Sequence, residues 1–502
     1  MSGITRGRED ITMKQKTNGR VRFRKVLIVN PPYHAEWRGL TPHIGQAYLA
    51  ETLSDQGIEY DVLDMNLGYK LRHLHQKIRD FQPDLVGMSL ISLEHKRLYQ
   101  LLSAIRNFDE RLRIVVGGPH VTILKNQVLK ECPEIDYGIV FEGEGTLTEL
   151  CQGVPENEIK GLIFRNGDDV VYTGDREFVS NLDQIPWPRY EKFEMRRYVP
   201  EITIYSSRGC PYQCIFCPNR IISPIFRPRS AKHVGDEIEY WYGRGYRQFN
   251  FDDDNFNLIR ERVFEICDEI EKRGLKGLFL RCSNGIRADC VDKEMLMRMR
   301  EVGFNYIAFG VDAGNNKILE IVKKGETMEA IERAIKLACD LGYNVKLLFV
   351  VGTPYETRSD VEDKVRLSRK YPIQEVHFYN TIPYPGTELY DWVGKSGYFL
   401  IKPEEYLNNI SCLTKAPVFE TPELPKQERI KLYRYLAKVR SQVHRDAVRR
   451  IFQKYGVIGR LLSLILANGL MERLFYQNRL FRRAAESFRF RLALGKKSFT
   501  SS

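Results

Sequence analysis

Three cysteines in one short segment are the residues of this chain most suited to chemistry. Cys210, Cys214 and Cys217 form a Cys-x3-Cys-x2-Cys pattern, with Gly209 before the first thiol and Phe216 directly before the last. Three thiolates on one loop can hold three irons of a [4Fe-4S] cluster, and no fourth cysteine lies nearby in the sequence. The alternatives are a zinc site completed by a distant ligand, or three unrelated thiols. We expect a cluster whose fourth iron stays open for a reaction.

Six short segments after the thiols carry further glycines, carboxylates and arginines. In chain order they are Arg-Pro-Arg-Ser at 227–230, Phe-Asp-Asp-Asp-Asn-Phe at 251–256, Arg-Ala-Asp at 287–289, Gly-Val-Asp-Ala-Gly at 310–314 ahead of Lys323 and Lys324, Gly-Thr-Pro-Tyr-Glu-Thr at 352–357 and Pro-Tyr-Pro-Gly-Thr at 383–387. Together with the cysteines they resemble the radical SAM subgroup that has an N-terminal cobalamin-binding domain. The resemblance extends over residues 22–400.

The resemblance implies a cofactor set and a reaction type. A [4Fe-4S] cluster on the three cysteines would bind S-adenosylmethionine (SAM) and cleave it reductively to a 5'-deoxyadenosyl radical. In the methylating relatives, this radical activates an unactivated carbon, which then takes a methyl group from methylcobalamin. Other relatives carry out ring formation or oxidation without methyl transfer, as in the anaerobic cyclase of chlorophyll synthesis. Either reaction needs an electron donor such as flavodoxin or ferredoxin.

The resemblance also gives expected roles to four charged side chains. Asp253 and Asp254 would accept hydrogen bonds from the SAM ammonium group, although such acidic pairs also cap helices. Arg287 would pair with a carboxylate, and Asp312 would contact ribose hydroxyls. Relatives commonly have Glu at the last position, so the shorter Asp makes that contact uncertain.

Three further residues complete the expected site of the second domain. Phe216 would lie beside the cofactors, and Gly352 would pack along the adenine, although an apolar strand end usually belongs to the core. Tyr384 would lie over the substrate entrance, where an aromatic hydroxyl could support a hydrogen-atom or proton step. A turn tyrosine more often simply packs against its neighbours.

The N-terminal part of the sequence predicts a Rossmann-like α/β unit. Buried-strand runs alternate with helical stretches such as 44–56, and the runs are 25–30, 59–64, 85–90, 114–119 and 137–140. Strands linked by crossover helices form a parallel sheet, and ligands bind at the carboxyl ends of its strands. Small or polar residues fall at these ends, namely Ser89, Gly117, Gly118, Glu142 and Gly143.

We expect these strand-end residues to bind cobalamin, since this region resembles the cobalamin-binding domain of the same subgroup. The alternative is a Rossmann-like unit that has lost its cofactor. The Asp-x-His-x-x-Gly motif, which supplies a cobalt ligand in other B12 enzymes, is absent. His34 and His43 lie in the first loop, but loop histidines are usually exposed or hydrogen-bonded rather than metal ligands.

The whole chain divides into five expected parts. They are a basic leader at 1–22, the cobalamin-binding domain at 23–150, a linker with a hairpin at 151–200, the radical SAM barrel at 201–400 and a basic helical region at 401–502. The barrel would contain six strands, at 202–205, 248–252, 277–282, 306–311, 345–351 and 375–379. Six parallel strands with their helices make a partial (β/α)6 barrel with its chemistry at the carboxyl edge.

The charge and cysteine content suggest where the protein works. The net charge is +12, and residues 426–502 alone contain 19 Lys and Arg against 4 Asp and Glu. Apolar residues recur between these cations, which is typical of a helix lying on anionic lipid, but also of a helical cap with a solvated basic face. Scattered single cysteines and the lack of a signal peptide favour the cytoplasm, with contact at the inner membrane surface. We expect no nucleic-acid partner, since no RNA-binding module accompanies the basic tail.

The first functional hypothesis is therefore a cobalamin-dependent radical SAM enzyme that methylates an unactivated carbon of an apolar or lipid-like small molecule. Three alternatives remain open at the level of sequence. One is radical oxidation, cyclisation or carbon–carbon bond formation without methyl transfer, with or without cobalamin in the N-terminal domain. The others are a non-enzymatic iron–sulfur or corrinoid-binding module and a tRNA-modifying enzyme.

Overall fold

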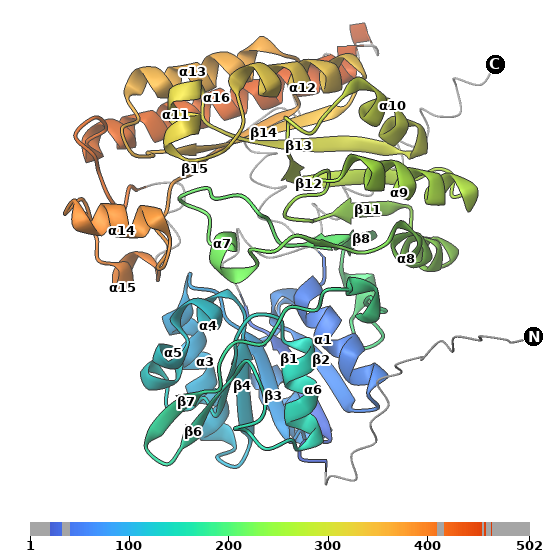
Figure 1. Ribbon diagram of the computed structural model, residues 1–502, viewed down its shortest axis with the longest axis vertical. Helices are drawn as coiled ribbons and strands as arrows, with labels where there is room; N and C mark the ends of the chain where they lie inside the picture. Colours follow the sequence, from blue (N-terminus) through green and yellow to red (C-terminus); the bar gives the residue numbers. More distant parts are fainter. Residues whose placement is uncertain (1–20, 33–40, 409–415, 454–455, 458–462, 464–502) are drawn as a thin grey trace, which may run out of the picture.

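A computed structural model of the chain describes residues 21–32, 41–408, 416–453, 456–457 and 463. Within them, two parallel-type sheets follow each other along the chain, each covered by helices (Figure 1). The first sheet occupies the lower half of the view and the second the upper half, with α7 (Asn219–Ile222) between them. Residues 1–20 of the expected leader, His34 and residues 464–502 of the expected C-terminal region lie outside the described residues.

The first sheet has the strand order β2-β1-β3-β4-β5-β6-β7. Its strands are β1 (Lys25–Asn30), β2 (Glu59–Asp64), β3 (Leu85–Ser89), β4 (Arg113–Gly117), β5 (Tyr137–Ile139), β6 (Leu162–Asn166) and β7 (Asp169–Tyr172). The first five run parallel, so the chain reverses its direction of travel across the sheet between β1 and β3. Ligands of doubly wound sheets bind at this kind of switch point.

Helices cover both faces of the first sheet. They are α1 (Ile44–Asp55), α2 (Leu71–Phe81), α3 (His95–Phe108), α4 (Pro119–Leu124), α5 (Asn126–Glu131) and α6 (Glu144–Gln152). In β1, Val26 and Ile28 pack in one hydrophobic cluster with α1 and α6, while Leu27 and Val29 pack in another with α2 and α3. Burial on both faces explains why these strands are continuous apolar runs in the sequence.

The hairpin at 162–172 belongs to the first sheet, although the sequence analysis places it in a linker. β6 pairs antiparallel with β5, and β7 pairs antiparallel with β6. The physical reason is the edge of the sheet: β5 has only three residues, and an unpaired edge strand exposes its backbone groups. The hairpin satisfies the outer backbone groups of β5.

The second sheet confirms the expected partial barrel of six parallel strands. In the order β15-β14-β13-β12-β11-β8 it contains β8 (Glu201–Ile204), β11 (Gln248–Phe251), β12 (Phe279–Ile286), β13 (Phe304–Asp312), β14 (Asn344–Val351) and β15 (Glu375–Asn380). The connecting helices are α8 (Ala231–Gly243), α9 (Arg260–Lys272), α10 (Lys293–Val302), α11 (Asn316–Ile321), α12 (Met328–Asp340) and α13 (Arg358–Lys370). Alternate strand residues such as Phe249, Phe309 and Phe349 form one buried cluster with these helices.

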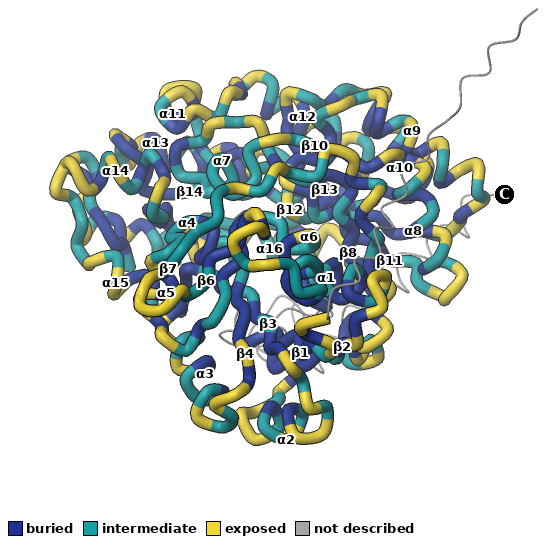
Figure 2. The backbone as a smooth tube through the Cα atoms, turned by 60° about the horizontal axis from the view of Figure 1, so that its bottom comes forward, coloured by how far each residue is buried: buried dark blue, intermediate teal, exposed yellow. Residues whose placement is uncertain are grey.

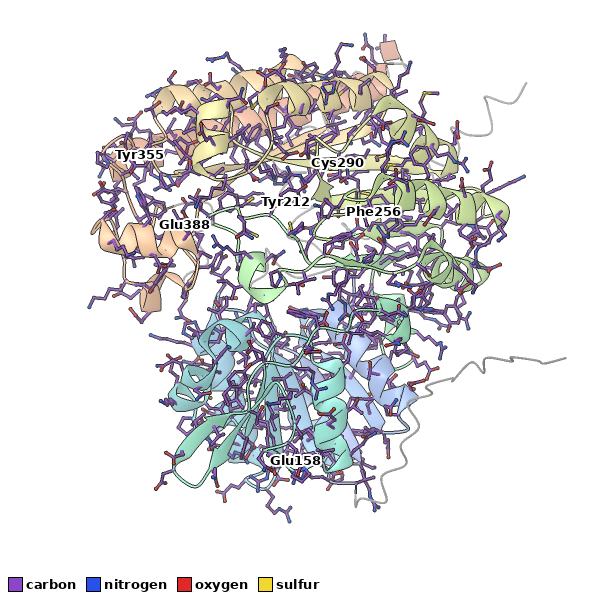
Figure 3. All side chains as sticks on the ribbon, viewed as in Figure 1. Glu158, Tyr212, Phe256, Cys290, Tyr355 and Glu388 are labelled. Atoms are coloured by element: carbon purple, nitrogen blue, oxygen red, sulfur yellow. The ribbon has the colours of Figure 1, made fainter. Side chains whose placement is uncertain are left out.

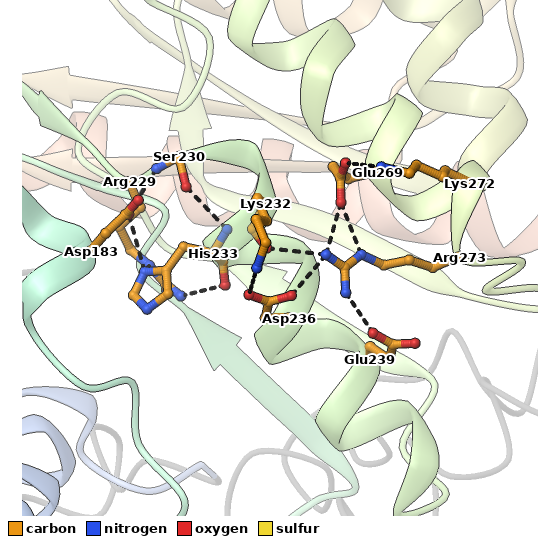
Figure 4. Close-up of polar contacts among 10 residues, drawn as sticks. All are labelled: Asp183, Arg229, Ser230, Lys232, His233, Asp236, Glu239, Glu269, Lys272 and Arg273. Atoms are coloured by element: carbon orange, nitrogen blue, oxygen red, sulfur yellow. Dashed lines mark hydrogen bonds and ion pairs between the residues drawn. The ribbon is translucent and has the colours of Figure 1, made fainter. Parts of the chain in front are cut away.

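Burial follows the strands, as Figure 2 shows by colour, and exposed residues gather on the outer faces of the helices. Polar contacts then connect neighbouring helices at the surface. Arg273, just after α9, contacts Asp236 and Glu239 of α8 at 2.8 and 2.5 Å, and Glu269 of its own helix (Figure 4). These contacts fix the side-by-side packing of α8 and α9.

The last described helix, α16 (Lys426–Phe452), packs against β15 and α13. Its buried apolar side chains recur every three or four residues, which places them on one face, and they are Leu432, Leu436, Val439, Val443 and Ala447. Arg429 is fully buried near the helix start. Within the described residues, no helix is long and apolar enough to cross a membrane.

Candidate active site between two sheets

The cysteine segment leaves β9 (Ser207–Arg208) and ends at α7. Gly209 opens it with φ +86°, where a Cβ atom would come within 2.1 Å of the Ile225 carbonyl oxygen. The next residue, Cys210, donates its backbone N–H to the Ser223 carbonyl oxygen at 3.1 Å. The first thiol is therefore held by a tight backbone crossing that only glycine permits.

Two carboxylates after β11 organise this loop. Asp254 accepts hydrogen bonds from the Gly209 backbone N–H at 3.2 Å and from the Asn219 side-chain amide at 2.5 Å, so it joins the two ends of the cysteine segment. Asp253 is 1% exposed and accepts from the Ser206 hydroxyl at 2.5 Å and the Ser207 N–H at 2.6 Å. Both oxygens of Asp253 are thus used inside the protein, which fits loop positioning rather than the SAM contact expected from the sequence.

The three thiols form a donor set that fits an iron–sulfur cluster. All are partly buried and none is in a disulfide. Burial raises the pKa of Cys214 to about 11 and that of Cys217 to about 12. The Lys324 ammonium and the Arg287 guanidinium act in the opposite direction on Cys214. Thiols in this setting need a metal's own charge to become thiolates, and nearby cations stabilise the negative charge of a thiolate-bound cluster.

Arg287 and Asp312 lie near the thiols, but each already has a partner within the chain. The Arg287 guanidinium contacts both Asp289 carboxylate oxygens at 2.9 and 2.8 Å and stacks over the Tyr212 ring at 3.5 Å. Asp312 accepts from the Lys324 ammonium at 2.8 Å. Figure 3 labels Tyr212 near the middle of the molecule. Sequence reasoning assigned no role to Tyr212 or Lys324, although Lys324 stands in one of the quoted segments.

Gly352 directly follows β14, Tyr384 lies shortly after β15, and the two residues differ in their surroundings. A Cβ atom on Gly352 would fall 1.9 Å from the Arg429 guanidinium, so α16 fills the space beside this glycine. Tyr384 is half-buried, and burial raises its pKa to about 12. Its backbone carbonyl accepts from Thr387, which caps α14 (Glu388–Lys395). Gly352 is therefore required by helix docking, whereas the Tyr384 hydroxyl is protonated at neutral pH.

A cavity of about 340 Å³ lies between the two sheets. All the residues that the sequence analysis assigned to cobalamin line it, namely Ser89, Gly117, Gly118, Glu142 and Gly143. The opposite wall comes from the second half of the chain, with Tyr205, Ser207, Arg208, Ile222, Ser223, Asp252 and Asp254. Asp254 therefore belongs both to the cavity wall and to the support of the cysteine loop.

The cavity residues fit a large ligand that carries hydrogen-bonding groups. Gln46 Oε1 and Ser207 Oγ line it, are buried, and lack a hydrogen-bond partner among the described residues. Buried polar atoms usually have a partner, so these two are candidates to bind a ligand. Gly118, with φ +93°, has no room for a Cβ atom, which would lie 2.6 Å from Ser89 Oγ. Gly118 therefore lets the ends of β3 and β4 pack closely at the cavity wall.

His43 also lines the cavity and forms the N-cap of α1. Its Nδ1 accepts the backbone N–H of Gln46 at 3.2 Å, and burial lowers its pKa. A neutral imidazole that accepts through Nδ1 carries its proton on Nε2. His43 therefore serves as a helix cap beside the cavity.

Ion pairs connect the two walls of the cavity. Arg208 contacts Glu142 at 3.0 Å and Glu144 at 2.7 Å, and Arg227 contacts Glu142 at 2.8 Å. These side chains are mostly buried, and the two arginines hold the pKa of Glu142 below its ordinary value. Since Arg208 directly precedes Gly209, this network ties the cysteine loop to the first sheet.

Replacing Arg208 with alanine should lower the free energy of unfolding by about 3 kcal/mol, because it leaves the mostly buried Glu144 carboxylate without its ion-pair partner and removes one of the two arginines that contact Glu142. Chemical denaturation of the purified protein measures the change. Arg111→Ala is the matched control, since Arg111 is 93% exposed beside Asp109 and its loss should cost less than about 0.5 kcal/mol. Equal stability of the two variants would show that the Arg208 network does not hold the sheets together.

Family comparisons agree with this geometry. Residues 204–367 match the model of the radical SAM superfamily, and residues 32–151 match that of the B12 binding domain. The chain is a radical SAM enzyme with a B12-binding domain. Radical SAM membership implies a [4Fe-4S] cluster and SAM, and the second match implies cobalamin, so the family supports all three cofactors expected from the sequence.

Individual relatives include methylating and cyclising enzymes. An uncharacterized methyltransferase of Pyrococcus horikoshii is 28% identical over 416 residues, which cover 80% of this chain and 90% of the relative. The anaerobic magnesium-protoporphyrin IX monomethyl ester cyclase of Cereibacter sphaeroides is 28% identical, over 73% of this chain and 63% of the relative. The solved structure of OxsB, a cobalamin-dependent SAM radical enzyme, has a TM-score of 0.69 and 18% identity, and covers 96% of this chain and 82% of that chain. The structural likeness supports the shared fold.

Proposed function

We propose that this enzyme methylates an unactivated carbon of a small, lipid-like substrate. The observation that carries the proposal is the shared cavity, which has the cobalamin-binding strand ends on one wall and the support of the cysteine loop on the other. A methyl donor and a radical source must act on one substrate carbon, so their sites must face each other. The methyltransferase relative supports this choice over other radical reactions.

The bound cofactors would supply reductive SAM cleavage, hydrogen-atom abstraction and a methyl group renewed by a second SAM. The chain's own residues hold these groups in place. Cys210, Cys214 and Cys217 would bind the cluster, and Asp254 would keep both ends of their loop in register. The largely apolar lining of the cavity would exclude water from a reactive carbon.

Further assignments divide between the two walls. Ser89, Gly117, Gly118, Glu142 and Gly143 would lie against the corrin ring, with Glu142 also anchoring Arg208. Beside the cysteine loop, Phe216, Arg287 and Asp312 would surround SAM, the last two while keeping their contacts with Asp289 and Lys324. Tyr384 would face the substrate as a protonated hydroxyl. Asp253 and Gly352 would act by supporting the loop and α16, respectively.

The outer face of α16 supports contact with an anionic membrane. Cations recur there every three, four or seven residues, which places them on one side of the helix, and they are Lys431, Arg434, Lys438, Arg445 and Arg449. Each of these is exposed or half-exposed, while the apolar stripe of the same helix is buried against the barrel. Such a surface would bring the enzyme to a lipid-like substrate, and an acidic redox protein could dock on the same charges.

The second candidate is a radical cyclisation or oxidation without methyl transfer, which the cyclase relative favours. Product stoichiometry separates the two. Anaerobically reconstituted enzyme with cobalamin, a low-potential reductant, a membrane lipid extract and SAM labelled in its methyl group should form 5'-deoxyadenosine and S-adenosylhomocysteine together. The label should appear in a lipid product. 5'-Deoxyadenosine without S-adenosylhomocysteine or labelled product would favour the cyclase reading and contradict the methylation proposal.

A further inference from the structure

The second sheet has one apolar face and one polar face. Residues that face the helices belong to the hydrophobic cluster, as Phe251, Cys282, Ile307 and Val345 illustrate. Successive side chains of a strand point to opposite faces, so the residues between them face the concave side of the sheet. Charged residues are frequent among them, and six that are considered below are Glu201, Asp252, Arg281, Lys346, Glu375 and His377.

This polar interior departs from ordinary barrel packing. The inside of a (β/α) barrel is normally filled by branched apolar residues, and parallel strands are normally apolar on both faces. Charges inside a fold are retained when they are paired or when they bind something. Each charge on the concave face of this sheet should therefore have a partner within the chain or bind a ligand.

Four of these six residues have ion-pair partners within the chain. Arg281 contacts Glu201 at 2.9 Å, and His377 lies 3.7 Å from Glu375. Lys346 makes no hydrogen bond or ion pair with any residue that the structure describes. Asp252 accepts one long hydrogen bond, at 3.4 Å, from the Asn250 side chain.

Asp252 and Lys346 lie at the same level of the sheet on strands that do not touch. One row of register partners crosses four strands, namely Phe251, Cys282, Ile307 and Val345. Asp252 directly follows Phe251 at one end of this row, and Lys346 directly follows Val345 at the other. Three strand spacings of about 4.8 Å separate them, or about 14 Å along the sheet and less across its concave face. They are thus too far apart to pair directly. Asp252 also lines the cavity between the sheets.

The pKa shifts of Asp252 and Lys346 agree with the lack of an ion-pair partner at each group. Burial, followed by the neighbouring Asp253 carboxylate, raises the pKa of Asp252 to about 6. Burial also lowers the pKa of Lys346, and Glu375, which lies opposite it in register on β15 without forming an ion pair with it, offsets only part of this effect. A counter-charge from a ligand would favour the ionised form of each group.

We propose that the concave face of the second sheet binds a substrate with a zwitterionic head, whose cationic group contacts Asp252 and whose anionic oxygens contact Lys346. This inference rests on the proposed function, and it specifies the polar end of the lipid-like substrate. The apolar part would extend from Asp252 into the cavity, where the methylated carbon would lie. A substrate that is apolar throughout would leave both charges unmet.

A ladder of ω-amino acids of increasing chain length tests the spacing directly. Ligand-observed NMR on the cobalamin- and cluster-loaded enzyme, without reductant, measures binding in the absence of turnover. We expect one or two lengths to bind about tenfold more tightly than the alkylamine or the carboxylic acid of the same length, since each charge-assisted contact contributes more than 1 kcal/mol. Equal binding of all compounds, or no binding by any, would overturn the proposal.

Two variants assign the ends of the ligand. Lys346→Met should remove the preference for the amino acid over the alkylamine, and Asp252→Asn should remove the preference over the carboxylic acid, with Lys293→Met as the control at an exposed site. Neither variant should lower the melting temperature, because neither charge supports the fold. A lower melting temperature with unchanged ligand preference would assign both charges to structure and refute the proposal. Zwitterion binding without methyl transfer would instead contradict only the proposed function.

Discussion

Cys214→Ala is expected to abolish SAM cleavage. The middle thiol of Cys210, Cys214 and Cys217 has no substitute, since the other cysteines of the described chain lie outside this loop. Loss of a residue that only supports a metal ligand typically costs 10 to 100-fold, so loss of a ligand should reduce 5'-deoxyadenosine formation by more than about 100-fold. Iron and sulfide content, together with product formation under anaerobic conditions, measure the effect.

Cys339→Ala is the matched control for this prediction. Cys339 is partly exposed on α12 and lies outside the cysteine loop. Its replacement should leave iron content and SAM cleavage unchanged. Normal iron content in the Cys214 variant, or a single bound zinc in the unaltered protein, would mean that the loop does not carry an open [4Fe-4S] cluster.

Gly209→Ala is expected to have a comparable effect through the backbone alone. The added Cβ atom would meet the Ile225 carbonyl oxygen at 2.1 Å and the Ser223 carbonyl oxygen at 2.9 Å, and the residue would keep φ +86°. Overpacking costs about 1–3 kcal/mol and the left-handed conformation about 1–2 kcal/mol. The loop should shift to relieve this strain, which displaces Cys210, so cluster content should fall well below that of the unaltered protein.

The control for Gly209 is another glycine with free space. Gly243 ends α8, and a Cβ atom there meets no atom within 4 Å. Gly243→Ala should leave cluster content unchanged and stabilise the helix by up to about 1 kcal/mol. Iron analysis after parallel reconstitution compares the two variants. If Gly209→Ala binds a full cluster, the backbone crossing at Ile225 does not control the position of the first thiol.

The sequence predicts local features of this molecule well. The strands of both sheets are recognisable because their burial is regular and helices or turns bound each run. The strand-end residues Ser89, Gly117, Gly118, Glu142 and Gly143 come together at one cavity because parallel strands present their carboxyl ends at one edge. The cysteine loop is recognisable from spacing alone.

Contacts between distant parts of the chain were not predictable in the same way. Gly352 looks like a ligand-binding glycine in its own segment, but the guanidinium that fills its space comes from α16. The pairing of Arg208 with Glu142 and Glu144 likewise depends on how the two sheets meet. Asp253 and Asp254 are adjacent carboxylates with different partners, because one side chain is turned into the core and the other toward the loop.

The burial of Arg429 limits how the basic C-terminal region can be studied. Its guanidinium donates to the carbonyl oxygens of Phe419 and Val351 and to the Asn380 side chain, so the start of α16 completes the carboxyl edge of the barrel. A deletion that begins ahead of Lys426 would open that edge and impair the catalytic domain itself. Membrane attachment is therefore better separated from catalysis by replacing the exposed cations of α16 than by deleting the helix, since such variants keep Arg429 and its contacts with the barrel.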